Sequence, residues 1–141
     1  MSAALDAFVA RFRAAALSRA EWTHTAHLRV GAWHVHHHGA EAAGGLLRTA
    51  IRALNERHGT PNSATSGYHE TITVAYVQLI AASLTAGGGD APLATRVEHL
   101  LASPLAQPDY LLRFWSRERL MSARARAEWV PPDLAPLRLS R

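Results

Sequence analysis

Apolar residues recur at helical spacing along successive segments of the chain. The first segment covers residues 3–17, and two more cover residues 24–38 and 41–58. Gly39 follows the second segment and Gly59 follows the third, and a glycine just after the last apolar turn is typical of a helix end. The pattern therefore predicts three helices in the first part of the chain.

The segment 69–86 carries apolar residues around nearly its whole circumference. A helix of this kind needs neighbours on every side, so we expect it to lie at the centre of a helical bundle. Its β-branched residues also allow a buried strand, but the length of the segment favours a helix. We expect the glycine triplet 87–89 to end this helix.

The last third of the chain predicts shorter elements. A helix is expected over residues 91–102, followed by a turn that Pro104 and Pro108 bracket. One or two short helices fit residues 109–129, and the proline-rich end, residues 130–141, is predicted to be an extended tail. The whole chain is thus expected to form one all-α domain, a helical bundle of about five to seven helices.

Short polar residues precede several of the predicted helices. Thr23 is a candidate N-cap for the second helix, while Ser18 and Glu21 have the spacing of a capping box. Ser66 and Asp90 are candidate N-caps for two later helices. These residues mark where the helices are predicted to begin.

Composition and charge limit the function classes. The chain has 141 residues, 48% of them hydrophobic, which is enough for one domain with a core. It has no cysteine, so disulfide scaffolds and thiol catalysis are excluded, and a transition metal must be bound by His, Asp or Glu. The net charge of +4 is modest and charges of both signs are mixed along the chain, so nucleic acid is not an expected partner.

No targeting or membrane segment is predicted. The first residues lack the basic start, apolar stretch and cleavage site of a signal peptide. The longest apolar stretch, residues 74–86, is shorter than the roughly twenty residues that a membrane-spanning helix needs. We therefore expect a cytoplasmic protein without membrane contact.

Histidines supply the main candidate chemistry. His24 and His27 lie one helical turn apart, and His69 with Glu70 opens the most apolar helix. If the beginnings of these two helices meet, the three histidines can bind a divalent transition metal such as zinc or iron, with Glu70 as a fourth ligand or as the base for a bound water. The leading hypothesis is a small metal-dependent enzyme, with hydrolytic or oxygen chemistry.

A metal-free alternative uses the same histidines. Buried histidines can hydrogen-bond to the backbone, to Glu70 or to a small polar molecule, as in a binding module or an acid/base enzyme. Short polar or aromatic side chains near the expected pocket are candidate ligand-binding residues. They are Asn62, Tyr68, Thr73 and Tyr76.

Two further clusters have other interpretations. The histidine run at 34–38 is predicted to be a solvated helix end, where protonated rings are favourable against the negative end of the helix dipole. The C-terminal helices are rich in arginine, which binds carboxylates and phosphates with two parallel hydrogen bonds, and an interaction protein is the third hypothesis. The arginines are Arg113, Arg117, Arg119, Arg124 and Arg126.

Three groups of residues together resemble a known pattern. They are Trp-Thr-His-x-Ala-His-Leu at 22–28, Gly-Tyr-His-Glu-Thr-Ile-Thr at 67–73 with Asn62 in the loop before it, and a C-terminal Ser-x-Glu-Arg-Leu-Met-Ser at 116–122 followed by Trp-Val-Pro-Pro-Asp-Leu at 129–134. This combination resembles a family of small uncharacterised bacterial proteins. The resemblance implies no particular activity, but it singles out His24, His27, His69 and Glu70 over the run at 34–38.

Overall fold

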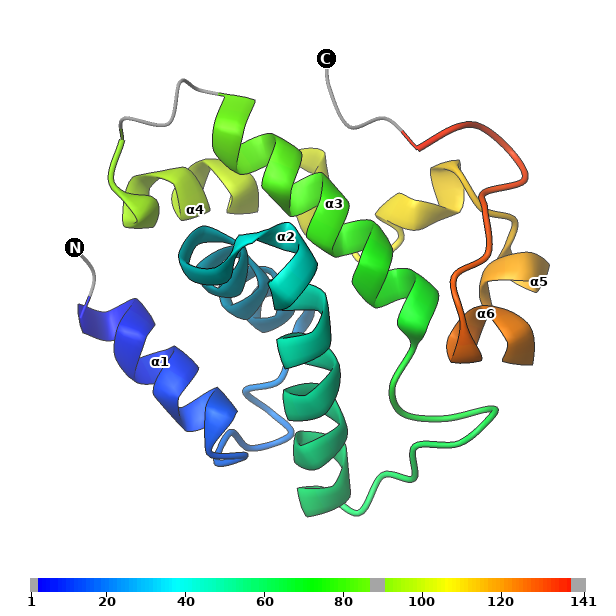
Figure 1. The fold of residues 1–141 in the computed structure, drawn as a ribbon, viewed down its shortest axis with the longest axis horizontal. Helices are drawn as coiled ribbons and strands as arrows, with labels where there is room; N and C mark the ends of the chain where they lie inside the picture. Colours follow the sequence, from blue (N-terminus) through cyan, green and yellow to red (C-terminus); the bar gives the residue numbers. More distant parts are fainter. Residues whose placement is uncertain (1–2, 87–90, 138–141) are drawn as a thin grey trace.

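The computed structural model describes residues 3–86 and 91–137, and every regular element in these residues is helical (Figure 1). The elements are α1 (Ala3–Arg13), α2 (His24–Arg57), α3 (Glu70–Ala86), α4 (Leu93–Leu101), the short 3-10 helices η1 (Pro104–Ala106) and η2 (Tyr110–Arg113), α5 (Arg117–Leu120) and α6 (Ala123–Ala127). The predicted all-α bundle is confirmed. The glycine triplet 87–89, the candidate cap Asp90 and the tail residues 138–141 lie outside the described residues.

The helix α2 spans both of the helices predicted over residues 24–38 and 41–58. At Gly39 the backbone leaves the helical region, with φ 83° and ψ 160°. Only glycine adopts this conformation readily, because a Cβ atom would clash with the backbone. The two halves of α2 consequently run in different directions (Figure 1), so Gly39 divides the helix where the sequence predicted a break.

The helix α3 crosses the centre of the molecule, with α1, α2 and α4 on one side and α5 and α6 on the other (Figure 1). Its residues Val77, Ile80 and Leu84 belong to a core shared with α1, α2 and α4. Its residues Ala75 and Leu79 belong to a second core built from η2, α5, α6 and the tail. The predicted central position of this helix is confirmed, and both cores account for its apolar circumference.

The turn before α2 uses both of the predicted start signals. The Thr23 side chain accepts a hydrogen bond from the amide of Ala26 and caps α2. The Ser18 hydroxyl accepts from the amide of Glu21 at 3.2 Å, and the Glu21 carboxylate accepts from the amide of Ser18 at 2.8 Å, so the two form a capping box one turn earlier. These contacts fix the direction in which α2 begins.

The end of the chain is attached to α3 and α5 by specific hydrogen bonds. The buried hydroxyl of Thr71 donates to the carbonyl of Glu128 at 2.8 Å and accepts from the amide of Val130 at 3.1 Å. The carboxylate of Asp133 accepts from the amide and the hydroxyl of Ser116, both at 2.7 Å. Residues 130–137 contain no helix, they bend at 133–135, and these bonds hold them in a defined position.

None of the helices in the described part of the chain combines the length with the apolar composition that a bilayer span requires. The most apolar helix, α3, is covered by other elements of the fold on both sides.

Candidate functional site

A cavity of about 440 Å³ lies between the first half of α2, α3 and the segment 108–121. Most of its wall is apolar, with side chains such as Leu28 from α2 and Ile72 from α3. Gly31 also forms part of the wall, and a Cβ atom there would lie 2.8 Å from Cδ1 of Ile80, so glycine permits the close packing of α2 on α3. The polar and charged side chains of this α2–α3 cavity are His24, His27, Thr73, Tyr76, Asp109 and Arg117.

The first turn of α2 places His24 and His27 on the cavity wall. Nε2 of His24 donates to the carbonyl of Leu105 at 2.8 Å, and Nδ1 of His27 donates to the carbonyl of Thr23 at 2.7 Å. The His27 ring also stacks on Trp22, with the ring centroids 3.7 Å apart. Within the described residues, Nδ1 of His24 and Nε2 of His27 have no hydrogen-bond partner. The two carbonyls thus fix the tautomers and leave one acceptor nitrogen on each ring.

His27 remains neutral at physiological pH. His27 is an exposed residue on the cavity wall, and the Trp22 ring covers one face of its imidazole. The resulting desolvation lowers the pKa of His27 well below 6.5, and the neighbouring charge of His24 adds to this effect, against the opposing hydrogen bond to Thr23. Nε2 of His27 is therefore a lone-pair acceptor on a residue that lines a largely apolar cavity.

Tyr76 supplies a hydroxyl with an unmet hydrogen bond. Its side chain lines the cavity from α3 and meets the His24 ring edge-on, with centroids 5.3 Å apart. The hydroxyl oxygen is buried and has no hydrogen-bond partner among the described residues. Burial raises the pKa of Tyr76, and the nearby Tyr110 and Asp109 raise it further, so the hydroxyl keeps its proton. It is available both as a donor and as an acceptor.

Thr73 also lines the cavity, but its hydroxyl already has a partner. Its Oγ1 donates to the carbonyl of His69 one turn earlier, at 3.0 Å. This bond leaves the oxygen with acceptor capacity only. Thr73 is therefore a secondary contact for a ligand.

His69 is the N-cap of α3, and its ring nitrogens are both engaged. Nδ1 accepts from the amide of Ile72 at 3.1 Å, and Nε2 donates to the carbonyl of Leu120 at 2.7 Å. Burial lowers the pKa of His69, as does the charge of Arg126, so the ring is neutral. His69, not Ser66, caps α3, and the nitrogens that the sequence assigned to a metal hold the fold together.

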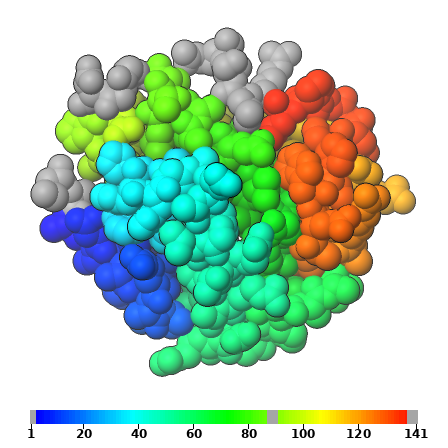
Figure 2. Space-filling view, in the orientation of Figure 1, coloured from blue at the N-terminus to red at the C-terminus, as the bar shows by residue number. Residues whose placement is uncertain are grey.

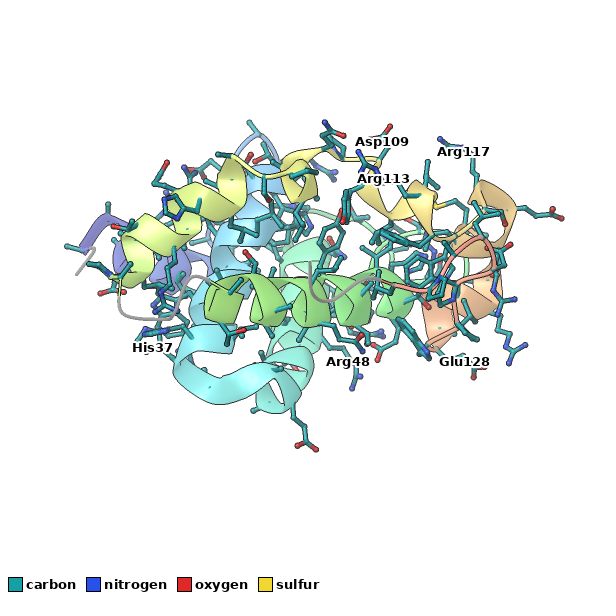
Figure 3. All side chains as sticks on the ribbon, turned by 90° about the horizontal axis from the view of Figure 1, so that it is seen from above. His37, Arg48, Asp109, Arg113, Arg117 and Glu128 are labelled. Carbon is teal, nitrogen blue, oxygen red and sulfur yellow. The ribbon has the colours of Figure 1, made fainter. Side chains whose placement is uncertain are left out.

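Glu70 is bound within an ionic network and does not line the α2–α3 cavity. Its carboxylate accepts from Nε and Nη2 of Arg48, at 3.1 and 2.8 Å, and from the hydroxyl of Tyr68 at 2.7 Å. Burial alone would raise the pKa of Glu70, but the hydrogen bonds and charge of Arg48 and the bond from Tyr68 outweigh it and lower the pKa. Figure 3 shows Arg48 on the opposite side of α3 from Asp109 and Arg117. Glu70 therefore does not face this cavity, where the sequence placed it as a metal ligand or as a base.

Asn62 stabilises the loop before α3 with its whole side chain. Its Oδ1 accepts from Nδ2 of Asn55 at 2.9 Å and from the amide of Tyr68 at 3.0 Å, while its Nδ2 donates to the carbonyl of Arg52 at 3.1 Å. Asn62, Tyr68 and Glu70 line a second hollow, between the second half of α2, this loop and α6. We refer to it as the α2–α6 groove.

The predicted site residues are thus divided between two places. The α2–α3 cavity contains His24, His27, Thr73 and Tyr76. The α2–α6 groove contains Asn62, Tyr68 and Glu70. His69 lines neither, and residues 3–86 and 91–137 contain no group of three or more His, Asp or Glu side chains placed to hold a metal. The three-histidine cluster is not assembled, because His69 turns its nitrogens to the backbone.

The histidine run at 34–38 is only partly a solvated helix end. Residues 36–38 are exposed, as predicted, but His34 is 1% exposed. Its Nδ1 donates to the carbonyl of Val30 at 2.7 Å, and its ring packs edge-on against Phe12. His34 is therefore a core residue, and its burial lowers its pKa.

Several arginines of the C-terminal segment contact the protein itself. Nε of Arg119 donates to the carbonyl of Pro131 at 2.7 Å, and the guanidinium of Arg113 lies 5.1 Å from the centre of the Tyr110 ring. Arg117 lines the α2–α3 cavity. These arginines do not form one free cationic surface, which weakens the interaction-protein hypothesis.

Sequence reasoning missed the contribution of the segment 105–121. The carbonyl of Leu105 orients His24, and Asp109 and Met121 complete the cavity wall. Trp22 packs against the core at Phe12 and also supports the His27 ring at the cavity wall. No local signal identifies the roles of Leu105, Asp109 and Met121, since each depends on helices that are distant in the sequence.

Comparison with known proteins adds no relative, since no protein-family model, curated protein or solved structure matches the chain. The geometry of the cavity and the groove is therefore the basis of the functional argument.

Proposed function

We propose that the α2–α3 cavity binds a small, largely apolar molecule that carries one neutral hydrogen-bonding group. The observation that carries this proposal is the Tyr76 hydroxyl, which is buried at the cavity without a partner among the described residues. An unpaired buried hydroxyl costs about 1–3 kcal/mol, and a ligand that bonds to it removes this cost. A volume of about 440 Å³ lies within the range typical of small-molecule sites.

The polar atoms at the cavity define the group that the ligand must carry. Neutral His27 and the free nitrogen of His24 accept hydrogen bonds, while the Tyr76 hydroxyl donates or accepts. A hydroxyl or an amide can donate to a histidine and accept from Tyr76. A carboxylate has no proton to donate to the lone pair of His27, and the charge of Asp109 on the wall offsets the attraction of Arg117. We therefore expect an alcohol or an amide on an apolar frame.

A metal-dependent enzyme remains the alternative, with His24 and His27 as two ligands one turn apart. Within the described residues no third His, Asp or Glu side chain joins them in one group. A zinc or iron ion bound there would take its other ligands from water or substrate, which makes for a weak site. With only two histidine ligands, the cavity favours binding of a small molecule without a metal ion.

Three probes that share a bicyclic frame test the proposal by isothermal titration calorimetry: indane, 1-indanol and indane-1-carboxylate. We expect 1-indanol to bind about fivefold more tightly than indane, which corresponds to one net hydrogen bond of about 1 kcal/mol. The carboxylate should bind most weakly. In the Tyr76→Phe variant the difference between 1-indanol and indane should disappear, since that variant lacks only the hydroxyl.

Tyr110→Phe is the matched control, because Tyr110 is a tyrosine of η2 that does not line the cavity. This variant should keep the preference for 1-indanol. The proposal fails if none of the three probes binds, or if Tyr76→Phe retains the preference. The metal-dependent alternative would be favoured if the wild type binds zinc and if both His24→Ala and His27→Ala lose this binding. His99→Ala, at an exposed site in α4, is the control for that measurement.

A further inference from the structure

The α2–α6 groove has a chemical character different from that of the cavity. It has a volume of about 830 Å³ and lies where α6 and the end of the chain meet the loop before α3, a junction seen on the surface in Figure 2. Figure 3 shows Arg48 and Glu128, which both line the groove, on the same side of α3. Six charged side chains contribute to its lining, whereas only Asp109 and Arg117 do so in the α2–α3 cavity apart from its histidines.

Positive charge exceeds negative charge in the groove, which contains four arginines and two glutamates. Glu70 is paired with Arg48, and Glu128 is paired with Arg124. Arg52 lies over the ring of Tyr68, 6.0 Å from its centre, and has no carboxylate partner among the described residues. The other unpaired arginine is Arg126. Two positive charges in one hollow are therefore left without an acidic partner.

The guanidinium groups of Arg48 and Arg126 differ in one respect. The edge of Arg48 formed by Nε and Nη2 is occupied by the two carboxylate oxygens of Glu70. Arg126 donates from Nη1 to the carbonyl of Gly67 at 2.8 Å, and its Nε is buried with no acceptor among the described residues. The Nε–Nη2 edge of Arg126 is thus the unfilled counterpart of the edge that Glu70 fills on Arg48. Such an edge matches two oxygens of a carboxylate or a phosphate.

An exposed aromatic ring lies beside these charges. Trp129 lines the groove with 36% of its surface exposed, and it packs edge-on against the buried Trp115, with centroids 5.5 Å apart. A ring held in this way offers a flat apolar surface to a planar group. The groove therefore combines an anion-binding edge with a stacking surface.

We infer that the α2–α6 groove binds a small molecule through its phosphate or carboxylate group, with Arg126 and Arg52 on the anion and Trp129 against the adjoining planar part. Because Nε of Arg126 is buried, the anion meets Nη2 first and reaches Nε as the side chain turns toward it. Glu70 has a positioning role, since it holds Arg48 and Tyr68 in the wall. This inference does not depend on what binds in the α2–α3 cavity.

Phenyl phosphate, benzoate and neutral benzyl alcohol are the probes, followed by NMR of the arginine Nε–H and tryptophan Nε1–H signals. We expect phenyl phosphate or benzoate to bind saturably and to shift the Nε–H signal of Arg126, which is assigned by its loss in Arg126→Gln. Benzyl alcohol should leave this signal unchanged. If phenyl phosphate shifts the Arg126 signal and benzoate does not, the groove is a phosphate site. If benzoate shifts the signal and phenyl phosphate does not, the groove is a carboxylate site.

Arg52→Gln is the decisive variant, since Arg52 is exposed on α2 and its loss should not prevent folding, whereas Arg126 also supports the loop at Gly67. Arg52→Gln should weaken binding of the anion about tenfold. Arg57→Gln, which removes the same charge about 1.4 turns further along α2 and outside the groove, should leave it unchanged. Trp129→Leu should reduce phenyl phosphate to the affinity of inorganic phosphate.

Two results would overturn the inference. One is the absence of saturable binding for both anions. The other is an equal loss of affinity in Arg52→Gln and Arg57→Gln, which would mean general charge attraction and no site. Calorimetry of Arg52→Gln with 1-indanol should match the wild type, so failure of the groove and failure of the cavity are distinguishable.

Discussion

At the beginning of α3 one ring makes two structural hydrogen bonds, from the amide of Ile72 to Nδ1 of His69 and from Nε2 to the carbonyl of Leu120. The sequence could identify His69 as a polar residue that opens an apolar helix. It could not distinguish capping from metal binding, since both use a neutral imidazole with a free lone pair. Only the position of Leu120, which is far along the chain, decides between the two roles.

Substitution of His69 separates the capping bond from the bond to Leu120. His69→Ala loses both and should lower the free energy of unfolding by about 2–3 kcal/mol. His69→Asn retains an oxygen that can accept from the amide of Ile72, so we expect it to recover about 1 kcal/mol. Urea unfolding followed by circular dichroism measures both. Equal stability of His69→Ala and the wild type would show that the ring is not a cap.

At the scale of the element, Gly39 made the break in α2 predictable, whereas no glycine marks the end of α1. Gly39 marks the break in α2 and has a backbone that only glycine adopts readily. The first helix was expected to reach Leu17, but it ends at Arg13, because Ala15 adopts a left-handed conformation with φ 56° and the amide of Ala16 bonds back to the carbonyl of Arg11. Nothing in an alanine-rich stretch signals such an end.

Two glycine-to-alanine substitutions in α2 should have opposite effects. Gly39→Ala strains the backbone whatever space surrounds it, and we expect it to cost about 1–3 kcal/mol. Gly44→Ala lies in helical backbone with no atom within 4 Å of the new Cβ, and it should gain about 0.5–1 kcal/mol. Chemical denaturation of the two variants gives the comparison. A stabilising Gly39→Ala would mean that α2 straightens at no cost.

For α1 we consider the opposite substitution, from alanine to glycine. Ala15→Gly relieves the left-handed strain at the end of the helix, and it should stabilise the protein by about 0.5–1 kcal/mol. Ala10→Gly places glycine in the helical, exposed part of α1 and should destabilise by a similar amount. The order of thermal midpoints should be Ala15→Gly above wild type above Ala10→Gly. A lower midpoint for Ala15→Gly than for wild type would contradict the strained C-terminus.

At the scale of the molecule, α3 separates two kinds of chemistry. The apolar α2–α3 cavity and the charged α2–α6 groove lie against different sides of it, and each is completed by residues beyond position 104. Helical periodicity predicted the bundle and its central helix, because each helix has its own apolar pattern. It could not place the C-terminal segment, because short 3-10 turns and an extended tail have no such periodicity. For this reason the sequence merged His24, His27 and Glu70 into one site.

Buried neutral histidines should make the whole fold sensitive to acid. Burial lowers the pKa values of His34 and His69 in the folded protein below the ordinary 6.5. The unfolded chain therefore takes up protons near pH 6.5 that the folded protein does not, and the stability that is fully present above this pH is lost as the pH falls toward the folded values. The lowered pKa of Glu70 acts in the same direction below about pH 4.5.

The free energy of unfolding should consequently fall steadily from pH 7 to pH 5, by up to about 1.4 kcal/mol per pH unit for each such histidine. Urea unfolding at half-unit pH intervals measures the slope. In His69→Asn the slope should be smaller, because one of the groups that must stay neutral is gone, whereas His99→Gln at an exposed position of α4 should keep it. A stability that is constant or rises toward pH 5 would mean that these rings accept protons without disturbing the bonds that His34 and His69 make to the backbone.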